Sequence, residues 1–285
     1  GRRGGRNDRA SRASDLRAAA GSMMRLVSLG SGSSGNGFLL DTGNAAMLID
    51  CGVGVRTIQA ALRDFDVHDR LSAIIVSHEH IDHIRSVDSI ARRTGSPIVT
   101  TRGTFQAIRS ERPFSPRSAG ERFAEAGVEI RFVSVSHDAA EPCGFVIDDG
   151  KTRIAIFTDL GYVGESVVDA IRDADIIVLE SNYDRRMLRS GPYPARLKRR
   201  IESPTGHLSN DDCAAALVSL TTARTRAIWL AHLSDKNNSA AIALASAREA
   251  IALAGYATPV GVLDRFERTD VTSLPAIQLS LGMGV

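Results

Sequence analysis

The chain has few cysteines, few aromatic residues and no long apolar run. Its cysteines, Cys51, Cys143 and Cys213, lie far apart without CxxC spacing, so neither a disulfide framework nor a zinc ribbon is indicated. This cysteine usage fits a reducing, cytoplasmic setting. No apolar run is long enough to cross a membrane. One Trp, four Tyr and nine Phe among 285 residues argue against extended base stacking along a nucleic-acid strand.

The sequence also lacks an excess of either charge. It has 35 Lys and Arg against 33 Asp and Glu, a formal net charge of +2. Residues 1–24 hold six Arg and two Asp and contribute +4, so the remainder, with 29 basic and 31 acidic residues, carries −2. Any attraction for nucleic acid must therefore be local.

Residues 1–24 are rich in Arg, Gly, Ala and Ser and are expected to form a disordered basic leader. Their composition loosely fits a transit peptide, but they contain no apolar segment for secretion. We favour a leader without function over a targeting arm. Residues 25–285 contain no internal repeat and no Pro/Ser-rich linker, so they are predicted to form a single domain.

A glycine-rich stretch, Gly30 to Gly35, formally fits the GxGxxG pattern of dinucleotide-binding proteins, and Asp50 follows twenty residues after Gly30. In that class of protein the glycines must open a helix. Here they lead to Asn36-Gly37, a hairpin turn signal, between apolar runs. The runs predict a three-stranded meander over 25–29, 38–40 and 47–50. A meander is not a βαβ unit, so dinucleotide binding is rejected.

The stretch His78-Glu79-His80-Ile81-Asp82-His83 concentrates three imidazoles and a carboxylate in six positions. The apolar run 71–76 before it predicts a buried strand, and Ile84, Val87 and Ile90 behind it recur at helical spacing. Ligands of α/β proteins usually bind at such strand ends. Burying these groups without a partner would cost several kcal/mol. Imidazole and carboxylate together suit zinc, so the stretch is a candidate metal site. The alternative interpretation is a hydrophilic start of a helix, with Asp82 near the N-cap.

Four further polar residues lie at the ends of predicted elements. His137, Asp159 and His232 each follow an apolar strand, and His207 precedes a helix. A capping or surface role is the default for each of them alone. Together they place six of the seven histidines at element ends and leave only His68 in a plain loop. A metal site assembled from several loops would require this arrangement.

The remaining pattern predicts alternating strands and helices. Strands are expected over 73–76, 98–101, 128–135, 144–147, 153–158, 176–179 and 227–231, and helices over 57–65, 87–93, 105–110, 165–171, 213–221 and 240–254. This order favours an α/β (α+β) fold. Two mixed sheets would pack face to face, with helices on the outer faces.

At this point the sequence resembles a known family. HEHIDH resembles the HxHxDH motif of the metallo-β-lactamase-fold hydrolases, and the later His, Asp and His match the family's remaining metal motifs. Seven further stretches are similar to the YycJ/WalJ-like group: GSGSSGNGFLL, LIDCG, SHDAAEP, FTDLGYV, LESNYD, GHLSN and LAHLSDKNN. The resemblance covers roughly residues 25–260 and implies a four-layer αββα sandwich. Ser86 departs from the glycine that commonly follows the motif, and residues 1–24 have no counterpart.

The resemblance also implies a ligand set for two metal ions, Zn²⁺ first and Mn²⁺ as a second possibility. One ion would be held by His78, His80 and His137. The other would be held by Asp82, His83 and His232, with Asp159 bridging. A metal-bridged hydroxide would attack the substrate, oriented by Asp82, and His207 would bind or protonate the scissile phosphate.

The implied activity is phosphodiester hydrolysis, as a nuclease or exonuclease acting on DNA. A basic cluster that would steer a phosphate backbone is formed by Arg185, Arg186, Arg189, Arg196, Lys198, Arg199 and Arg200; the alternative for it is a solvated helix face. Candidate substrate contacts are Ser33, Ser34, Asn36, Asn182, Ser209 and Asn210. The first three alternatively serve the glycine turn, and Ser209 and Asn210 alternatively cap a helix. Other functions left open are a thioester or lactone hydrolase and a non-catalytic metal-binding regulator.

Overall fold

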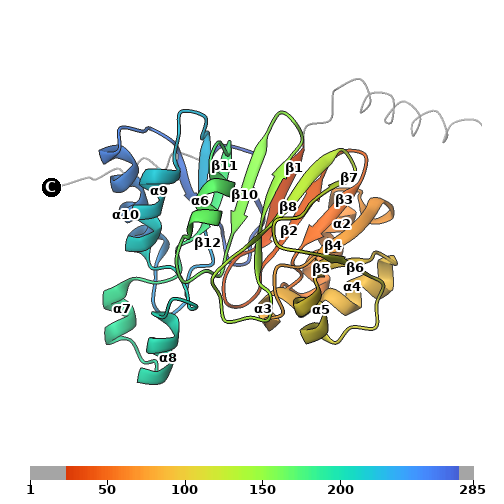
Figure 1. Ribbon diagram of the computed structural model, residues 1–285, viewed down its shortest axis with the longest axis horizontal. Helices are drawn as coiled ribbons and strands as arrows, with labels where there is room; N and C mark the ends of the chain where they lie inside the picture. Colours follow the sequence, from red (N-terminus) through yellow and green to blue (C-terminus); the bar gives the residue numbers. More distant parts are fainter. Residues whose placement is uncertain (1–23, 276–285) are drawn as a thin grey trace, which may run out of the picture.

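The computed structural model describes residues 24–275 and contains two seven-stranded sheets packed face to face, with helices outside them (Figure 1). The predicted leader, apart from Met24, lies outside the described residues. The predicted four-layer αββα architecture is confirmed.

The first sheet has the strand order β14-β1-β2-β3-β4-β5-β6. The strands β1, β2 and β3 pair antiparallel, as the meander predicted, and β3 to β6 pair parallel. The bounds are β1 Arg25–Gly30, β2 Gly37–Asp41, β3 Ala46–Ile49, β4 Leu71–Ile75, β5 Ile98–Thr101, β6 Phe114–Arg117 and β14 Thr269–Asp270.

The second sheet has the order β13-β12-β11-β10-β9-β8-β7. Its strands pair antiparallel from β7 to β10 and parallel from β10 to β13. The bounds are β7 Arg122–Glu125, β8 Val128–Ser134, β9 Cys143–Asp148, β10 Arg153–Phe157, β11 Ile176–Glu180, β12 Ala227–Ala231 and β13 Val260–Val262.

Alternation along each strand divides the apolar residues between two cores. In β10, Ile154 and Ile156 face the first sheet, whereas Ala155 and Phe157 face the helices. Because both faces of the central strands are covered, the strands read as nearly continuous apolar runs. Burial on both faces fixes the register of the strands, and with it the position of every strand end.

The helices form the outer layers and one projection. The bounds are α2 Val55–Asp64, α4 Val87–Thr94 and α5 Arg102–Ile108 on the first sheet, and α6 Glu165–Ile171, α9 Asn210–Leu220 and α10 Ala240–Leu253 on the second. Two short helices, α7 Arg185–Ser190 and α8 Ala195–Ile201, project at the edge where α3, Ile81–Ile84, also lies (Figure 1). A 3₁₀ turn, η1, spans His68–Arg70. No helix among the described residues is both long and apolar enough to span a membrane.

The structure differs from the sequence-based expectation in several elements. The helix expected behind the histidine cluster is two helices, α3 and α4, separated at Arg85 and Ser86. Ser86 Oγ donates to Val53 O at 2.6 Å, and the backbone N–H of Ser86 donates to Cys51 O at 2.8 Å. These contacts hold the break in place. Helix α5 begins three residues earlier than predicted, because the side chain of Thr101 caps it.

Candidate metal centre

The loops that follow four strands of the two sheets meet at one edge of the molecule. His78 and His80 follow β4, His137 follows β8, and Asp159 and His232 follow β10 and β12. The structure therefore brings together all seven predicted metal ligands, in four overlapping groups whose ligand atoms lie within 4.8 Å of one another.

His78, His80 and His137 form the first group. The Nδ1 atom of His80 lies 3.2 Å from His78 Nε2 and 3.1 Å from His137 Nε2. Donor atoms of a tetrahedral zinc site, each about 2.1 Å from the ion, lie about 3.4 Å apart. His137 Nδ1 donates to the carbonyl oxygen of Gly206 at 3.0 Å, which leaves a lone pair on Nε2. The spacing and the tautomer both fit a shared cation.

Asp82, His83 and His232 form the second group. Asp82 Oδ2 lies 3.8 Å from His83 Nε2 and 3.4 Å from His232 Nε2. On the outer side, Nδ1 of His83 donates to Asp50 Oδ2, and Nδ1 of His232 donates to Glu180 Oε1, both at 2.8 Å. Each carboxylate fixes the tautomer in which Nε2 carries a lone pair facing the group.

Asp159 lies between the two groups. Its Oδ2 is 3.1 Å from His83 Nε2 in the second group, and its Oδ1 is 3.9 Å from His137 Nε2 in the first. Asp159 Oδ2 is buried and accepts no hydrogen bond in the described part of the chain. A buried carboxylate oxygen without a partner is costly, and a cation on either side would satisfy it. The donor set therefore fits divalent metal ions.

Charge accumulates at this edge because several carboxylates are buried beside imidazoles. Burial lowers the pKa of His83, but Asp159 and Asp50 outweigh it and hold that pKa well above its usual range. For His232, Asp159, Asp82 and Glu180 likewise outweigh burial and raise the pKa to about 10. Burial raises the pKa of Asp159, but His232 and His83 hold it well below its usual range. The centre therefore favours positive charge, from protons or from metal ions.

Two carboxylates, Glu180 and Asp50, contact the candidate metal ligands and were not predicted as site residues from the sequence. Glu180 is fully buried at the end of β11; its Oε1 accepts from His207 Nδ1 at 2.8 Å as well as from His232, and its Oε2 accepts from two backbone N–H groups at 3.0 Å. Asp50 accepts from the backbone N–H of Ser77 at 2.8 Å as well as from His83. Both residues lie within the family-like stretches LESNYD and LIDCG. Their position at the end of a strand is the feature of the sequence that could have identified them.

The backbone around the centre is unusual. Asp50, Asp159 and His232 adopt φ of 57°, 56° and 56°, the left-handed region that side chains other than glycine rarely occupy. Strained backbone of this kind is typical of functional sites. Gly52 is packed so tightly that a Cβ atom would lie 1.5 Å from the carbonyl oxygen of Asp82. Only glycine permits the loop after β3 to hold the histidine cluster.

The centre is open on one side. The side chains of His80, Asp82 and His207 are 30%, 18% and 20% exposed to solvent. The side chains of the remaining predicted metal ligands are almost completely buried. Burial lowers the pKa of His207, but Glu180 outweighs it and raises that pKa. His207 Nδ1 is 3.7 Å from Asp159 Oδ1. His207 therefore lies at the rim of the centre, outside the two ligand groups described above.

The predicted substrate contacts are distributed unevenly. Ser33 and Ser34 are exposed, whereas Asn36 is buried, with Nδ2 3.1 Å from His83 Nε2 and with Oδ1 accepting from Gly32 N–H. Asn182 is buried and donates to the carbonyl oxygen of His232 at 2.7 Å.

The last two predicted contacts lie at the start of α9. The side chain of Ser209 caps this helix by accepting from Asp212 N–H, so the capping alternative holds for it. Asn210 is the first helical residue, and its buried side chain bonds to Ser181 and Asn238. Both side chains are thus engaged by neighbouring protein groups.

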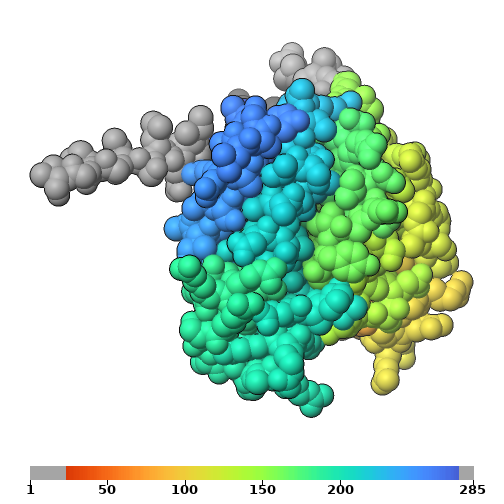
Figure 2. All heavy atoms as spheres, turned by 60° about the vertical axis from the view of Figure 1, so that its left-hand side comes forward, coloured from red at the N-terminus to blue at the C-terminus, as the bar shows by residue number. Residues whose placement is uncertain are grey.

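The basic cluster lies on α7 and α8, which belong to the projection at the bottom of Figure 2, and it approaches the open side of the centre through Arg200. Arg200 Nε pairs with Asp138 Oδ2 at 2.5 Å, and Asp138 Oδ1 is 3.9 Å from His80 Nε2. Arg185 pairs with Asp211 and Asp212, Arg189 with Glu202, and Lys198 donates to the carbonyl oxygen of Arg189. Arg186, Arg196 and Arg199 are exposed and pair with no carboxylate in residues 24–275.

Comparisons with known proteins agree with this architecture. Residues 46–232 match the family model described as a β-lactamase superfamily domain. The chain is 34% identical to exodeoxyribonuclease YycJ of Bacillus anthracis, over 85% of this chain and 93% of the relative. It is 36% identical to exodeoxyribonuclease WalJ of Streptococcus pneumoniae strain D39, over 74% of this chain and 81% of the relative.

A solved structure gives the same result for the fold. YhfI of Bacillus subtilis, a metallo-β-lactamase fold protein, superposes with a TM-score of 0.68 at 17% identity, over 87% of this chain and 99% of that chain. At this identity the likeness concerns the fold alone, whereas the two relatives and the family model cover most of the sequence. The chain therefore belongs to the β-lactamase superfamily, within it to the group of YycJ and WalJ, and is an enzyme of the metal-dependent hydrolase class.

Proposed function

We propose that the chain is a dinuclear metal-dependent phosphodiesterase, a cytoplasmic nuclease that acts as an exonuclease on DNA. The observation that carries the proposal is the position of Asp159 between the two ligand groups. Its Oδ2 is 3.1 Å from His83 Nε2, and its Oδ1 is 3.1 Å from His232 Nδ1 and 3.9 Å from His137 Nε2. Two relatives named exodeoxyribonucleases, aligned over most of both chains, support the choice of DNA. Two neighbouring cations suit phosphodiester cleavage because charge must be stabilised on several oxygens at once.

In this proposal the ligand set is the one expected from the sequence. His78, His80 and His137 would hold one ion, Asp82, His83 and His232 would hold the other, and Asp159 would serve both. Imidazole and carboxylate donors suit Zn²⁺, the ion we favour, and tolerate Mn²⁺. When bound, the two ions supply positive charge for a phosphoryl group and lower the pKa of a coordinated water.

Asp82 and His207 take the catalytic roles among the chain's own residues. Asp82 lies on the open side, 3.4 Å from His232 Nε2, where its second oxygen orients the attacking water. His207 donates Nδ1–H to Glu180, which leaves Nε2 for a phosphate oxygen. Because Glu180 raises the pKa of His207, the ring favours the protonated form that donates a proton to the leaving oxygen.

The surface beside the centre supplies a path for a polyanion. Arg186, Arg196 and Arg199 on α7 and α8 are exposed, and none pairs with a carboxylate among the described residues. Free guanidinium groups bind phosphate oxygens and make the affinity depend on salt. Ser33 and Ser34 are exposed beside Asn36 and complete the proposed substrate contacts. The side chains of Asn182, Ser209 and Asn210 instead bond to His232, Asp212 and Ser181, so they support neighbouring protein segments.

The test is a cleavage panel of end-labelled single- and double-stranded DNA and RNA, with a thioester and a lactone assayed in parallel. We expect DNA cleavage that chelation abolishes and that Zn²⁺ or Mn²⁺ restores. Asp82→Ala and His80→Ala should lose turnover while keeping the fold. His68→Ala is the matched control, because this exposed histidine lies away from the centre and contacts Asp69.

Three outcomes would refute the proposal. Full activity of Asp82→Ala and His80→Ala would exclude the mechanism, and a marked preference for the thioester or the lactone would replace nuclease activity with the alternative hydrolase function. Binding of fewer than two metal equivalents after loading, together with no turnover on any substrate, would favour the non-catalytic regulator.

A further inference from the structure

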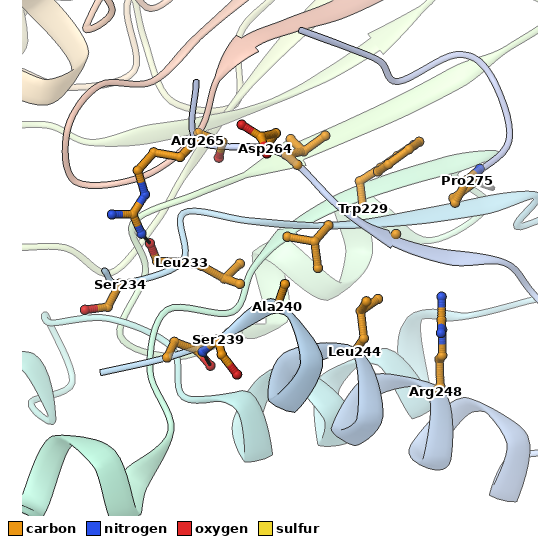
Figure 3. A pocket seen from close by; sticks show the side chains of 15 residues that line it. Trp229, Leu233, Ser234, Ser239, Ala240, Leu244, Arg248, Asp264, Arg265 and Pro275 are labelled. Carbon is orange, nitrogen blue, oxygen red and sulfur yellow. Dashed lines mark hydrogen bonds between the residues drawn. The ribbon is translucent and has the colours of Figure 1, made fainter. Parts of the chain in front are cut away.

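A cavity borders the loop after β12, which begins with His232 and continues through Leu233 and Ser234. Its volume is about 460 Å³, within the range of small-molecule sites. The walls come from the end of β12 and the loop after it, from the first turns of α10, and from β13 with the residues that follow it (Figure 3). None of the predicted metal ligands lines it.

The floor of the cavity is apolar. Leu233, Ala240 and Leu244 line its central part, and the ring of Trp229 lies along the upper wall (Figure 3). Trp229 is held in place because its Nε1–H donates to the carbonyl oxygen of Val271 at 3.0 Å. A flat apolar group, such as a nucleobase, can be covered by these side chains.

Each end of the cavity carries an arginine, because Arg265 and Arg248 lie on opposite sides of the apolar floor (Figure 3). Arg265 is engaged, because it pairs with Asp235 at 2.5 Å and donates to the carbonyl oxygen of Leu233 at 3.1 Å. Arg248 donates to the carbonyl oxygen of Val260 at 2.9 Å, but no carboxylate within residues 24–275 pairs with it. Its charge is available to an anion.

The other polar groups of the cavity suit hydrogen bonds to a neutral ligand. Ser31, Ser234 and Ser239 line it, and their Oγ atoms accept from the backbone N–H groups of His232, Asn237 and Ile242, which leaves each O–H to donate to a ligand. The single acidic lining residue, Asp264, is occupied, because its Oδ1 accepts from the N–H groups of Phe266 and Glu267 at 2.8 Å. The cavity therefore combines one free cation, an apolar floor and a row of hydroxyl groups.

We propose that this cavity binds a nucleoside monophosphate, with the phosphate on Arg248 and the base over Leu233, Ala240 and Leu244. The site is separate from the metal centre, and the proposal does not depend on the activity proposed above. Its occupant would touch the support of His232, since Ser31 Oγ accepts from the N–H of His232 at 2.9 Å and Arg265 holds the next residue.

The chain provides its own probe, because Trp229 is its single tryptophan and lines the cavity. The experiment is a fluorescence titration of the full, metal-loaded chain with deoxyadenosine 5′-monophosphate, deoxyadenosine and inorganic phosphate. We expect a saturable change with the nucleotide and binding at least about ten-fold weaker for the other two ligands, because each makes only part of the contacts. An equal response to inorganic phosphate would overturn the nucleotide assignment.

Variants separate this cavity from the metal centre. Arg248→Gln should weaken binding of the nucleotide by about ten-fold or more, through loss of a charge-assisted contact. Ala240→Leu should abolish binding by filling the cavity from an exposed helix position while Arg248 is kept. Arg63→Gln, an exposed arginine on α2, is the matched control and should bind normally.

The titration is repeated with His80→Ala and after chelation. We expect unchanged nucleotide binding in both cases, because no metal ligand lines the cavity. Binding that disappears with the metal but persists in Arg248→Gln would place the nucleotide at the metal centre and overturn the proposal. That result would leave the proposed nuclease activity intact, so the two proposals fail independently.

Discussion

Replacement of Glu180 by Gln is the most informative perturbation of the metal centre. Glu180 Oε2 accepts from the backbone N–H groups of Leu160 and Leu208, both at 3.0 Å, and Oε1 accepts from Nδ1 of His207 and of His232, both at 2.8 Å. A glutamine has one acceptor and one donor end. Since backbone N–H groups can only donate, the amide oxygen must stay with them, and the amide NH₂ then faces the two imidazoles.

This rotation reverses the tautomer of His232. Its Nδ1 would have to accept the new hydrogen bond, so the proton moves to Nε2, the atom that faces Asp82 at 3.4 Å. A protonated Nε2 cannot bind a metal ion. The loss expected for such a supporting carboxylate is about 10- to 100-fold in metal affinity, or about 1.4–2.7 kcal/mol. The first group, His78, His80 and His137, has no contact with Glu180 and should keep its ion.

The assay is a titration with Zn²⁺ against a competing chelator, followed by metal analysis. The wild-type chain should hold two ions, and Glu180→Gln should hold one tightly and one weakly, with a corresponding loss of turnover. Asp175→Asn is the control, since this carboxylate lies just before β11, at the other end of the strand, and pairs with Arg224 and Arg226. If Glu180→Gln bound both ions as tightly as wild type, the inferred role of Glu180 would be wrong.

Three further predictions concern stability and substrate binding. Gly52→Ala should destabilise the fold by about 2–4 kcal/mol in urea unfolding, because its Cβ would lie 1.5 Å from the Asp82 carbonyl oxygen; a wild-type midpoint would contradict the packing. In the metal-free folded protein the pKa of His83 is raised and the pKa of His232 is about 10, whereas an unfolded histidine has a pKa near 6.5. Protonation of these two side chains therefore stabilises the fold fully below pH 6.5, and this stabilisation is lost as the pH rises toward 10. The melting temperature of metal-free protein should fall over this range. Metal-loaded protein should instead keep or gain stability over this range, because its ligands must be deprotonated, and identical profiles with and without metal would argue against the ligand assignment. Substituting Arg186, Arg196 and Arg199 together by Gln should make the plot of log DNA affinity against log salt concentration less steep, by an amount that corresponds to up to about three phosphate contacts. An unchanged slope of this plot would show that α7 and α8 are not part of the DNA-binding surface.

The sequence predicted most of the central fold because its strands are buried on both faces. The strand 98–101, the strand 227–231 and the helix 165–171 agree with β5, β12 and α6 to the residue. The strands β6 and β7 were missed because they are short and half-exposed, and β6 contains Pro116, which is typical of an edge strand. The helices α7 and α8 were missed because their arginine-rich sequences show little apolar periodicity, although a small core around Tyr183 and Leu188 supports them.

The candidate metal ligands could be predicted from the sequence because histidine is a residue type that itself indicates metal binding. A histidine at a strand end has few structural reasons to be there, so the clustering of six histidines predicted which loops the structure brings together. Asp50 and Glu180 escaped notice because a single carboxylate after a strand is common, and only the folded chain brings them to within 2.8 Å of a histidine Nδ1 atom. Asn36 was expected at the substrate, but its side chain reaches His83, a contact that spans 47 residues of sequence and that no local pattern reveals.

The separation of the site's residues along the chain has a consequence for synthesis in the cell. Asp82 and His232 face each other across 150 residues, and β12, which positions His232, pairs with β11 and β13. A growing polypeptide therefore cannot complete the second ligand group until translation has passed His232 and the second sheet has closed. Ion capture becomes one of the last events of maturation, so nascent or truncated chains should not carry the activity.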